Sequence, residues 1–258
     1  MTGYFFLPLR EHYLCLNLLI RVMKKLLFLL MLSSSILFAQ NHIDENGLKQ
    51  GVWSKDYPWG SPRYEGAFKD DMEIGLFNFY DQNNKLVSQR NYETPGGISS
   101  AVMFLPKGGV EALGKFSGKK KIGEWKYFST KGYMLASENY TDGLKHGEEQ
   151  TYYADSTVAE IITWQTGIKN GPWVKYNFNG KVMQKDNYVN NQLHGQSQSN
   201  HNSGKKKVTG NYKKGLKNGK WFYYSDSGLQ EKMEVYEFGD LIKTVIREGD
   251  ELKTILHR

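Results

Sequence analysis

Glycine recurs at a fixed 24-residue interval, and this interval limits the possible folds more than any other feature of the chain. The glycines, whose position we call the slot, lie at 51, 75, 123, 147, 171, 195 and 219, and Ser99 fills the one slot that lacks a glycine. The residue seventeen after each slot is aromatic in all eight copies: Phe68, Tyr92, Phe116, Tyr140, Trp164, Tyr188, Tyr212 and Tyr236. Aromatics make up 14% of the sequence, so chance gives this series with a probability on the order of 10⁻⁷. The chain is therefore a tandem repeat.

Two other positions of the repeat hold turn-forming residues. Nine residues after the slot stand Gly60, Asn84, Gly108, Gly132, Ser156, Gly180, Gly204 and Gly228. Twenty residues after it stand Asp71, Pro95, Lys119, Gly143, Gly167, Asn191, Gly215 and Gly239. Because Gly and Asn tolerate positive φ at low cost, both series predict turns.

Short segments rich in Trp, Tyr and Phe, such as 124–128 and 220–224, lie between these turns and are typical of strands. Each repeat is thus predicted to be one β-hairpin. Eight hairpins predict an all-β fold: an elongated, twisted antiparallel β-meander of about sixteen strands, with no helical layer after Gln40. Aromatic rings of neighbouring hairpins are expected to pack on one another.

Residues 23–39 are predicted to direct export. Met23-Lys24-Lys25 precedes an apolar run over 26–38 and then Ala39, which is typical of a signal peptide over 23–39 cleaved near Ala39. Residues 1–22 are predicted to lie outside the mature protein, either upstream of a true start at Met23 or as an extended n-region. The expected location is periplasmic, cell-surface or secreted. The repeat domain is predicted over 40–242, with a capping hairpin over 243–258.

Charge and cysteine content exclude several classes of protein. The single cysteine, Cys15, precedes the signal peptide, so no disulfide framework or Cys-rich zinc site is predicted. Without residues 1–39 the net charge falls from +7 to +4, leaving 30 basic and 26 acidic residues. This mild excess does not indicate a nucleic-acid partner.

Several motifs resemble a known family. Ile122–Phe128, Asn170–Trp173 and Asn218–Tyr224 are similar to the variant class of MORN repeats, and the resemblance extends over residues 47–242. It implies a rolled or elongated antiparallel sheet and a non-enzymatic scaffold, with family roles in protein assembly and membrane-lipid attachment. Some bacterial relatives carry an antitoxin label, so an antitoxin-like role is an alternative, although that label fits poorly with an export signal.

Two sets of residues are candidates for binding. The aromatic series seventeen after the slot is expected to be core, whereas the Trp series two after the slot and nearby tyrosines form a candidate contact surface: Trp53, Trp125, Tyr127, Trp173, Tyr176, Trp221 and Tyr223. The clusters Lys119, Lys120, Lys121 and Lys205, Lys206, Lys207 are expected to be a solvated edge or a contact for anionic lipid head groups or envelope glycan.

No catalytic, metal or cofactor site is predicted. The G-x4-G-K match over 109–115 continues with Phe116 where a phosphate-binding loop needs Ser or Thr. The S-x-x-K matches at Ser117 and Ser203 fall at turns, and His146 and His194 are expected to be roughly 19 Å apart and to cap turns. The leading hypothesis is a non-enzymatic scaffold that binds another protein, with an anionic-ligand binder as the alternative. An enzyme built on the irregular third copy, residues 95–118, stays a third possibility.

Overall fold

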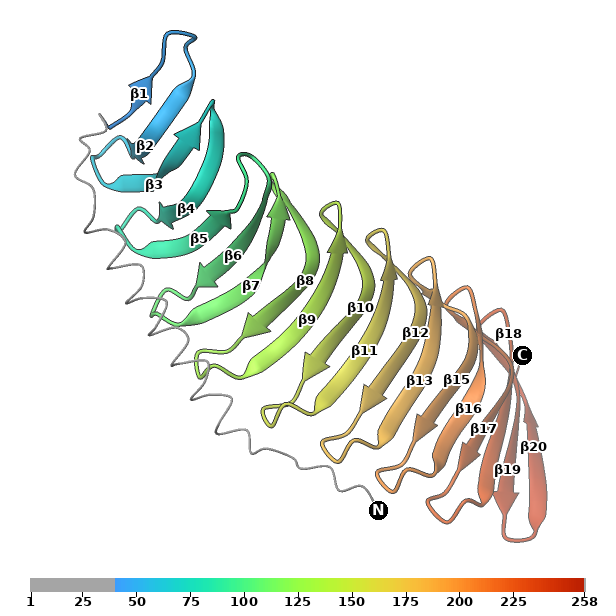
Figure 1. The fold of residues 1–258 in the computed structure, drawn as a ribbon. Coiled ribbons are helices and arrows are strands. Elements are labelled where there is room, and N and C mark those ends of the chain that lie inside the picture. The colour runs from blue at the N-terminus through green and yellow to red at the C-terminus, as the bar shows by residue number, and fades with distance from the viewer. Residues whose placement is uncertain (1–39, 258) are drawn as a thin grey trace, which may run out of the picture. The chain divides into compact units, whose positions relative to one another are not determined.

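The computed structural model describes residues 40–257, which form one open antiparallel sheet of 20 strands and no helix (Figure 1). The predictions for the signal peptide and for Cys15 lie outside these residues. The strands are β1 (His42–Ile43), β2 (Lys49–Asp56), β3 (Pro62–Lys69), β4 (Met72–Tyr80), β5 (Leu86–Tyr92), β6 (Ile98–Phe104), β7 (Val110–Ser117), β8 (Lys120–Phe128), β9 (Met134–Thr141), β10 (Leu144–Tyr152), β11 (Val158–Gln165), β12 (Ile168–Tyr176), β13 (Val182–Val189), β14 (Gln192–Leu193), β15 (Gly195–Asn200), β16 (Lys206–Lys213), β17 (Leu216–Tyr224), β18 (Gln230–Glu237), β19 (Asp240–Glu248) and β20 (Glu251–Leu256).

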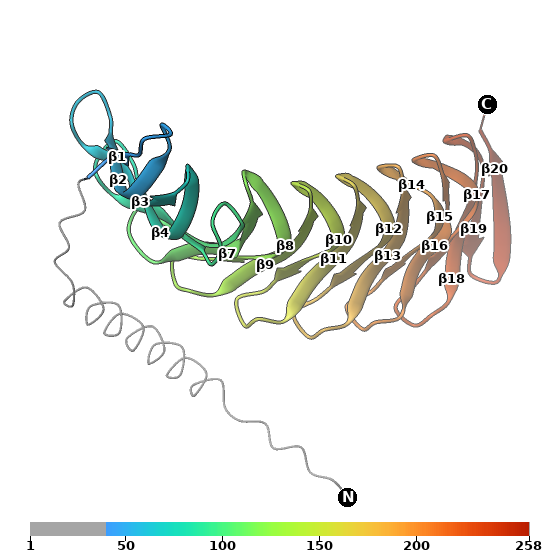
Figure 2. The same ribbon diagram turned by 45° about the horizontal axis from the view of Figure 1, so that its top comes forward.

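The sheet is a meander in which the strands follow one another in chain order. Each strand pairs antiparallel with the strand before or after it, and the strands are bowed and twisted (Figures 1 and 2). The predicted fold class is confirmed. The count exceeds sixteen because the edge strand β1 and the last hairpin, β19–β20, add to the eight repeats, and because β14 and β15 are two parts of one repeat strand. The predicted boundary at residues 242 and 243 falls inside β19.

Both predicted turn series lie at hairpin ends. The two series join the strands at their opposite ends, and we call these two long sides of the sheet, formed by the turns, its edges. All eight residues nine after the slot have positive φ, from 58° at Asn84 to 98° at Gly228. The residue twenty after the slot has positive φ in six copies, whereas in the other two the positive φ moves to Gly96, after Pro95, and to Gly118, before Lys119. The turn spacing read from the sequence is therefore correct, with a shift of one residue in those two copies.

The slot glycines mark breaks in strand register rather than turns. Each has positive φ, from 63° at Gly123 to 123° at Gly171. At Gly75, Gly123 and Gly219 the pairing between the strand and the strand before it shifts in register. Each shift is a β-bulge. Ser99 has no positive φ, and β5 pairs with β6 in unbroken register there. The bulge therefore depends on a residue that accepts left-handed backbone.

The aromatic series lies on one face of the sheet, which we call the aromatic face. Phe68, Tyr92 and Phe116 are buried there, and the rings of the other five copies are half-buried. Several of them meet an aromatic residue two after a slot edge-on, as in Phe116–Trp125 with ring centroids 4.9 Å apart and Tyr212–Trp221 at 4.9 Å. Burial confirms the expected core role of Phe68, Tyr92 and Phe116, whereas the other five rings are buried only in part.

At the position fifteen after the slot, glycine or isoleucine alternates with a charged residue, which gives the repeat a 48-residue period. The residues are Gly66, Arg90, Gly114, Glu138, Ile162, Asp186, Gly210 and Glu234. Where it is glycine, an aromatic ring of the next repeat can lie directly on the backbone, and a Cβ at Gly114 or Gly210 would lie 2.2 Å from the indole of Trp125 or Trp221. Glycine faces a ring of the next hairpin in three such pairs, and in the remaining pair Ile162 faces Trp173, so two consecutive hairpins form one packing unit.

Candidate functional site

A row of half-buried lysines lies on the aromatic face, each two residues before a slot. The row consists of Lys49, Lys121, Lys145, Lys169 and Lys217. Each ammonium group lies over one or more rings: Lys121 Nζ is 4.4 Å from the Trp125 centroid and Lys217 Nζ is 4.6 Å from that of Trp221. Cation–π attraction favours the charged amines in this position. We call this set the lysine row.

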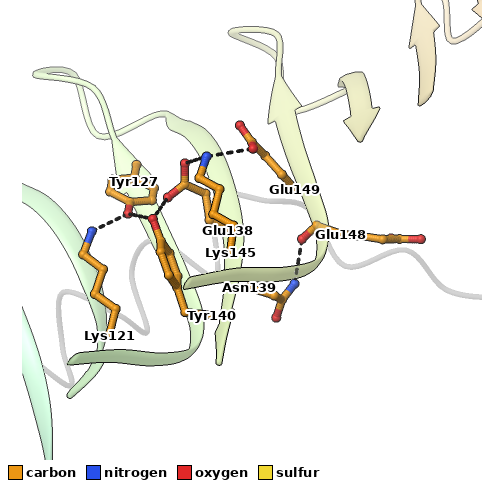
Figure 3. Close-up of polar contacts among 8 residues, drawn as sticks. All are labelled: Lys121, Tyr127, Glu138, Asn139, Tyr140, Lys145, Glu148 and Glu149. Carbon is orange, nitrogen blue, oxygen red and sulfur yellow. Dashed lines mark hydrogen bonds and ion pairs between the residues drawn. The ribbon is translucent and has the colours of Figure 1, made fainter. Parts of the chain in front are cut away.

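Lys121 belongs to a polar cluster across β8, β9 and β10 (Figure 3). Its Nζ donates to the Tyr127 hydroxyl at 2.8 Å, and the Tyr140 hydroxyl donates to the Glu138 carboxylate. Lys145 Nζ bridges Glu138, at 2.6 Å, and Glu149, at 2.8 Å. Both glutamates stand at positions of the aromatic face that hold Gly, Ile or Trp in several of the other copies.

The same cluster recurs 96 residues later with Lys217, Tyr223, Glu234 and Tyr236. Lys217 Nζ donates to the Tyr223 hydroxyl at 3.1 Å, and both tyrosines donate to Glu234. Lys232 replaces Lys145 as the ion-pair partner of the carboxylate, at 2.7 Å. The arrangement is therefore present at two places in the array.

These contacts change the proton affinity of the groups. Burial opposes the ionisation of Glu138, but hydrogen bonds from Lys145, Tyr140 and Tyr127 outweigh it and hold the pKa of Glu138 below its ordinary value. The pKa of Glu234 is lowered in the same way. Burial lowers the pKa of Lys121, and burial together with the facing Glu138 raises the pKa of Tyr127 far above its ordinary value. The carboxylates thus stay ionised and the tyrosines stay protonated at neutral pH.

The lysine row is not fully neutralised by acidic groups. Among residues 40–257, only Lys145 of the row has a carboxylate within 4.0 Å. The clusters hold no combination of nucleophile, base and oxyanion donors, since their hydroxyls are the phenols of Tyr127, Tyr140, Tyr223 and Tyr236. The arrangement can bind anionic or hydrogen-bond-accepting groups.

The structure separates the aromatic residues that the sequence grouped as a contact surface. Trp125 and Trp221 are 1% and 3% exposed, so their rings are core and cannot meet a partner while the sheet stays folded. This corrects their place in the contact surface, and the reason is the glycine backbone on which each ring lies. The remaining members are half-buried: Trp53, Tyr127, Trp173, Tyr176 and Tyr223.

The two lysine clusters do not form one patch. Lys119, Lys120 and Lys121 lie at the turn between β7 and β8, whereas Lys205, Lys206 and Lys207 lie at the turn between β15 and β16, on the opposite edge. Lys120 forms an ion pair with Asp142 at 2.8 Å, and Lys121 belongs to the lysine row. Exposed cations therefore remain at both edges, without a common surface.

The histidines have structural roles at turns. Thr166 N donates to His146 Nδ1 at 3.4 Å, and Lys214 N donates to His194 Nδ1 at 3.5 Å. The two contacts occupy equivalent repeat positions, as turn capping predicts. In the part of the chain that the structure describes, no three His, Cys, Asp or Glu side chains gather in a way that would hold a metal ion. Nor does that part include a helix long and apolar enough to cross a membrane.

The sequence contains a signal for the lysine row that the glycine spacing does not reveal. Lysine stands two residues before the slot in copies 1, 4, 5, 6 and 8. From the sequence alone, a lysine in a strand is predicted to be a solvated side chain. Only the ring contacts in the structure show that these amines lie on the aromatic face. The ion pair between Glu138 and Lys145 likewise could be predicted only with the strand register known.

The family comparison agrees with this architecture. A family model described as MORN repeat variant matches residues 73–94, 145–166, 169–190 and 193–214. Each match begins two residues before a slot glycine, at copies 2, 5, 6 and 7. The predicted resemblance is confirmed at these four segments.

No curated protein matches the chain. Among solved structures, a chain of the Photorhabdus luminescens Tc holotoxin pore (mutation TccC3-D651A) aligns with 76% of this chain at 11% identity and a TM-score of 0.21. The alignment spans 14% of that much longer chain, and similarity at this level carries no functional argument.

Proposed function

We propose, on the premise that this chain contains MORN-variant repeats, that it is an exported, non-enzymatic scaffold that binds another protein. MORN repeats are a non-catalytic type that generally serves as a scaffold or binding motif. The observation that carries the proposal is a row of exposed apolar side chains that follows the repeat along one edge of the sheet.

This apolar edge row stands at the first strand residue after the turns. It consists of Met72, Leu144, Ile168 and Leu216, which are 42%, 47%, 36% and 49% exposed. Leu144 and Ile168 occupy consecutive hairpins, roughly 9.6 Å apart. Phe238 and Val189, 68% and 40% exposed, extend the apolar surface at the same edge. Aligned apolar side chains beside charged turns are typical of a protein contact, because a partner would remove them from water.

Cross-linking tests this surface directly. Residues 40–258 contain no cysteine, so Leu144→Cys and Ile168→Cys each give one attachment point for a photo-cross-linker. In the native cell envelope both variants should capture the same partner, whereas Lys131→Cys, at an exposed turn on the opposite edge, should not. The double change Leu144→Glu with Ile168→Glu should weaken capture at least about tenfold without lowering the melting temperature. Equal capture from all three cysteine positions would contradict the proposal.

Export rests on the sequence of residues 23–39. The expected result on expression of the full chain in a bacterium is a mature protein whose first residue is Gln40, recovered outside the cytoplasm. Replacing Leu29 and Leu30 with Lys should keep the chain unprocessed inside the cell. An unprocessed wild-type chain in the cytoplasm would contradict export and leave the binding proposal to its own test.

A further inference from the structure

A groove crosses the middle of the sheet between β12 and β17, on the face opposite the aromatic rings. Its volume is about 750 Å³. Lys185 and Asn187 line it from β13, and Thr209 and Asn211 line it from β16. These residues alternate along their strands with Tyr188 and Tyr212 of the aromatic face, so they point to the opposite face. We call it the polar groove.

The polar groove has a positive charge that the protein does not neutralise. Lys185, Lys206 and Lys220 line it, and none of the three has a carboxylate within 4.0 Å in the described chain. The acidic residue that borders it, Asp186, directs its carboxylate to the aromatic face, where Gln184 Nε2 donates to it at 2.6 Å. Earlier copies differ, since Glu124 and Glu148 stand on this face where copies 7 and 8 have Gln196 and Lys220.

Neutral polar groups fill most of the remaining lining. The amides of Asn187, Gln196, Gln198 and Asn211 and the hydroxyl of Thr209 supply both donors and acceptors. Phe222 and Pro172 are the two apolar side chains that line the groove, and they stand on its two bounding strands. Cations, amides and a small apolar surface are complementary to a ring with hydroxyls, one apolar face and a negative charge.

We propose that the polar groove binds an acidic oligosaccharide, a short glycan whose sugars carry carboxylates. The lysines would pair with the carboxylates, the amides with the hydroxyls, and Phe222 with the apolar face of a sugar ring. The volume is within the range of about 300–1,000 Å³ that small-ligand sites occupy. This site goes beyond the proposed protein binding and uses no residue of the apolar edge row.

Two other classes of ligand fit the groove less well. A peptide that adds a strand needs unpaired backbone, but β13, β15 and β16 are paired on both sides. Lipid acyl chains need a continuous apolar surface, and Phe222 and Pro172 are separated by polar strands. The observations therefore favour a hydroxylated anion.

Titration calorimetry of residues 40–258 with tetragalacturonate tests the proposal. Binding is expected at about 50 mM salt and should weaken at least about fivefold at about 500 mM. The methyl ester of the same tetramer, which lacks the charges, should bind at least about tenfold more weakly. Inorganic phosphate and anionic phosphatidylglycerol vesicles should bind more weakly than the tetramer.

Matched variants locate the site. Lys185→Gln with Lys220→Gln should weaken tetragalacturonate binding at least about tenfold, and Phe222→Leu about threefold or more. Lys126→Gln is the control, because Lys126 lies on the same face at the repeat position of Gln198 but outside the groove. Circular dichroism should show unchanged melting in the Lys185 and Lys220 variants, since these side chains are exposed.

Several results would overturn the proposal. They are equal affinity for the acid and its ester, an equal loss in the Lys126→Gln control, tighter binding of phosphate or vesicles than of the sugar, and no binding of tetragalacturonate or of a glucuronate-containing tetramer. A chain that fails here but still gives site-specific capture at Leu144 and Ile168 would retain its scaffold function.

Discussion

At Gly114, a single hydrogen in place of a side chain allows the largest ring of the core to pack. A Cβ there would lie 2.2 Å from Trp125 Cδ2, and the ring, 1% exposed, has no open side to move into. Gly114→Ala should therefore destabilise the protein by about 1–3 kcal/mol, the usual cost of overpacking. Thermal melting by circular dichroism measures the change. Glu111→Ala, an exposed change in the same strand, should alter stability by less than about 0.5 kcal/mol.

The second prediction at this scale concerns pH. Glu138 and Glu234 have pKa values below the ordinary 4.5, so their contribution to stability is complete above that value and is lost as the pH falls through the folded-state pKa. The melting temperature should fall as the pH decreases from about 5 to about 3. Glu138→Gln with Glu234→Gln should lower melting at the higher pH and reduce the fall. An unchanged pH dependence in this variant would show that other groups cause it.

The residues that the sequence could not place are those whose role depends on register. The turns, the core series and the hairpin repeat follow from spacing, because φ and ring burial are local consequences of residue type. Trp125 could not be separated from Trp173 in this way, although the first is buried and the second half-buried. The difference lies in the facing residue, Gly114 or Ile162, which only strand pairing reveals.

At the scale of the strand, the residue at the slot determines whether its strand pairs with the preceding strand through a β-bulge. Gly75 has φ of 69°, and its Cβ would meet nothing within 4 Å, so Gly75→Ala isolates the cost of left-handed backbone. We expect a loss of about 1–2 kcal/mol, measured by chemical denaturation.

Ser99 is the matched control, because it fills the same slot without positive φ. Its buried hydroxyl has no hydrogen-bond partner within residues 40–257. Ser99→Ala should therefore leave stability unchanged or raise it. If both substitutions cost the same, the slot would not act through φ.

Element type could be read from the sequence, but surfaces between elements could not. The repeat predicted hairpins because turn residues bound each strand, and the structure confirms them. The polar groove draws its lining from β12, β13, β15, β16 and β17, at positions that differ between copies, so no conserved repeat position marks it. The lysine row could be predicted only in part. Its position repeats in the sequence, but its contact with the rings depends on the tertiary structure.

At the scale of the whole sheet, the 48-residue packing unit predicts which repeats can be removed. Deleting residues 171–218 places Trp221 next to Ile162, the neighbour that Trp173 has now. Deleting only 195–218 places Trp221 next to Asp186, whose carboxylate would face the indole. The longer deletion should therefore melt at a higher temperature than the shorter one, although it removes twice as much of the array. The reverse order would show that stability follows repeat number alone.

From β1–β2 to β19–β20 the strands pair with their neighbours in the chain, and the pairing β13–β15 skips only the two-residue β14. No contact has to wait for a distant segment, so the entropy of closing long loops does not slow assembly. The polypeptide can acquire its structure in the order in which it leaves a ribosome or a translocation channel, each finished hairpin serving as the template for the next. Such a chain can begin to fold before its whole length has emerged.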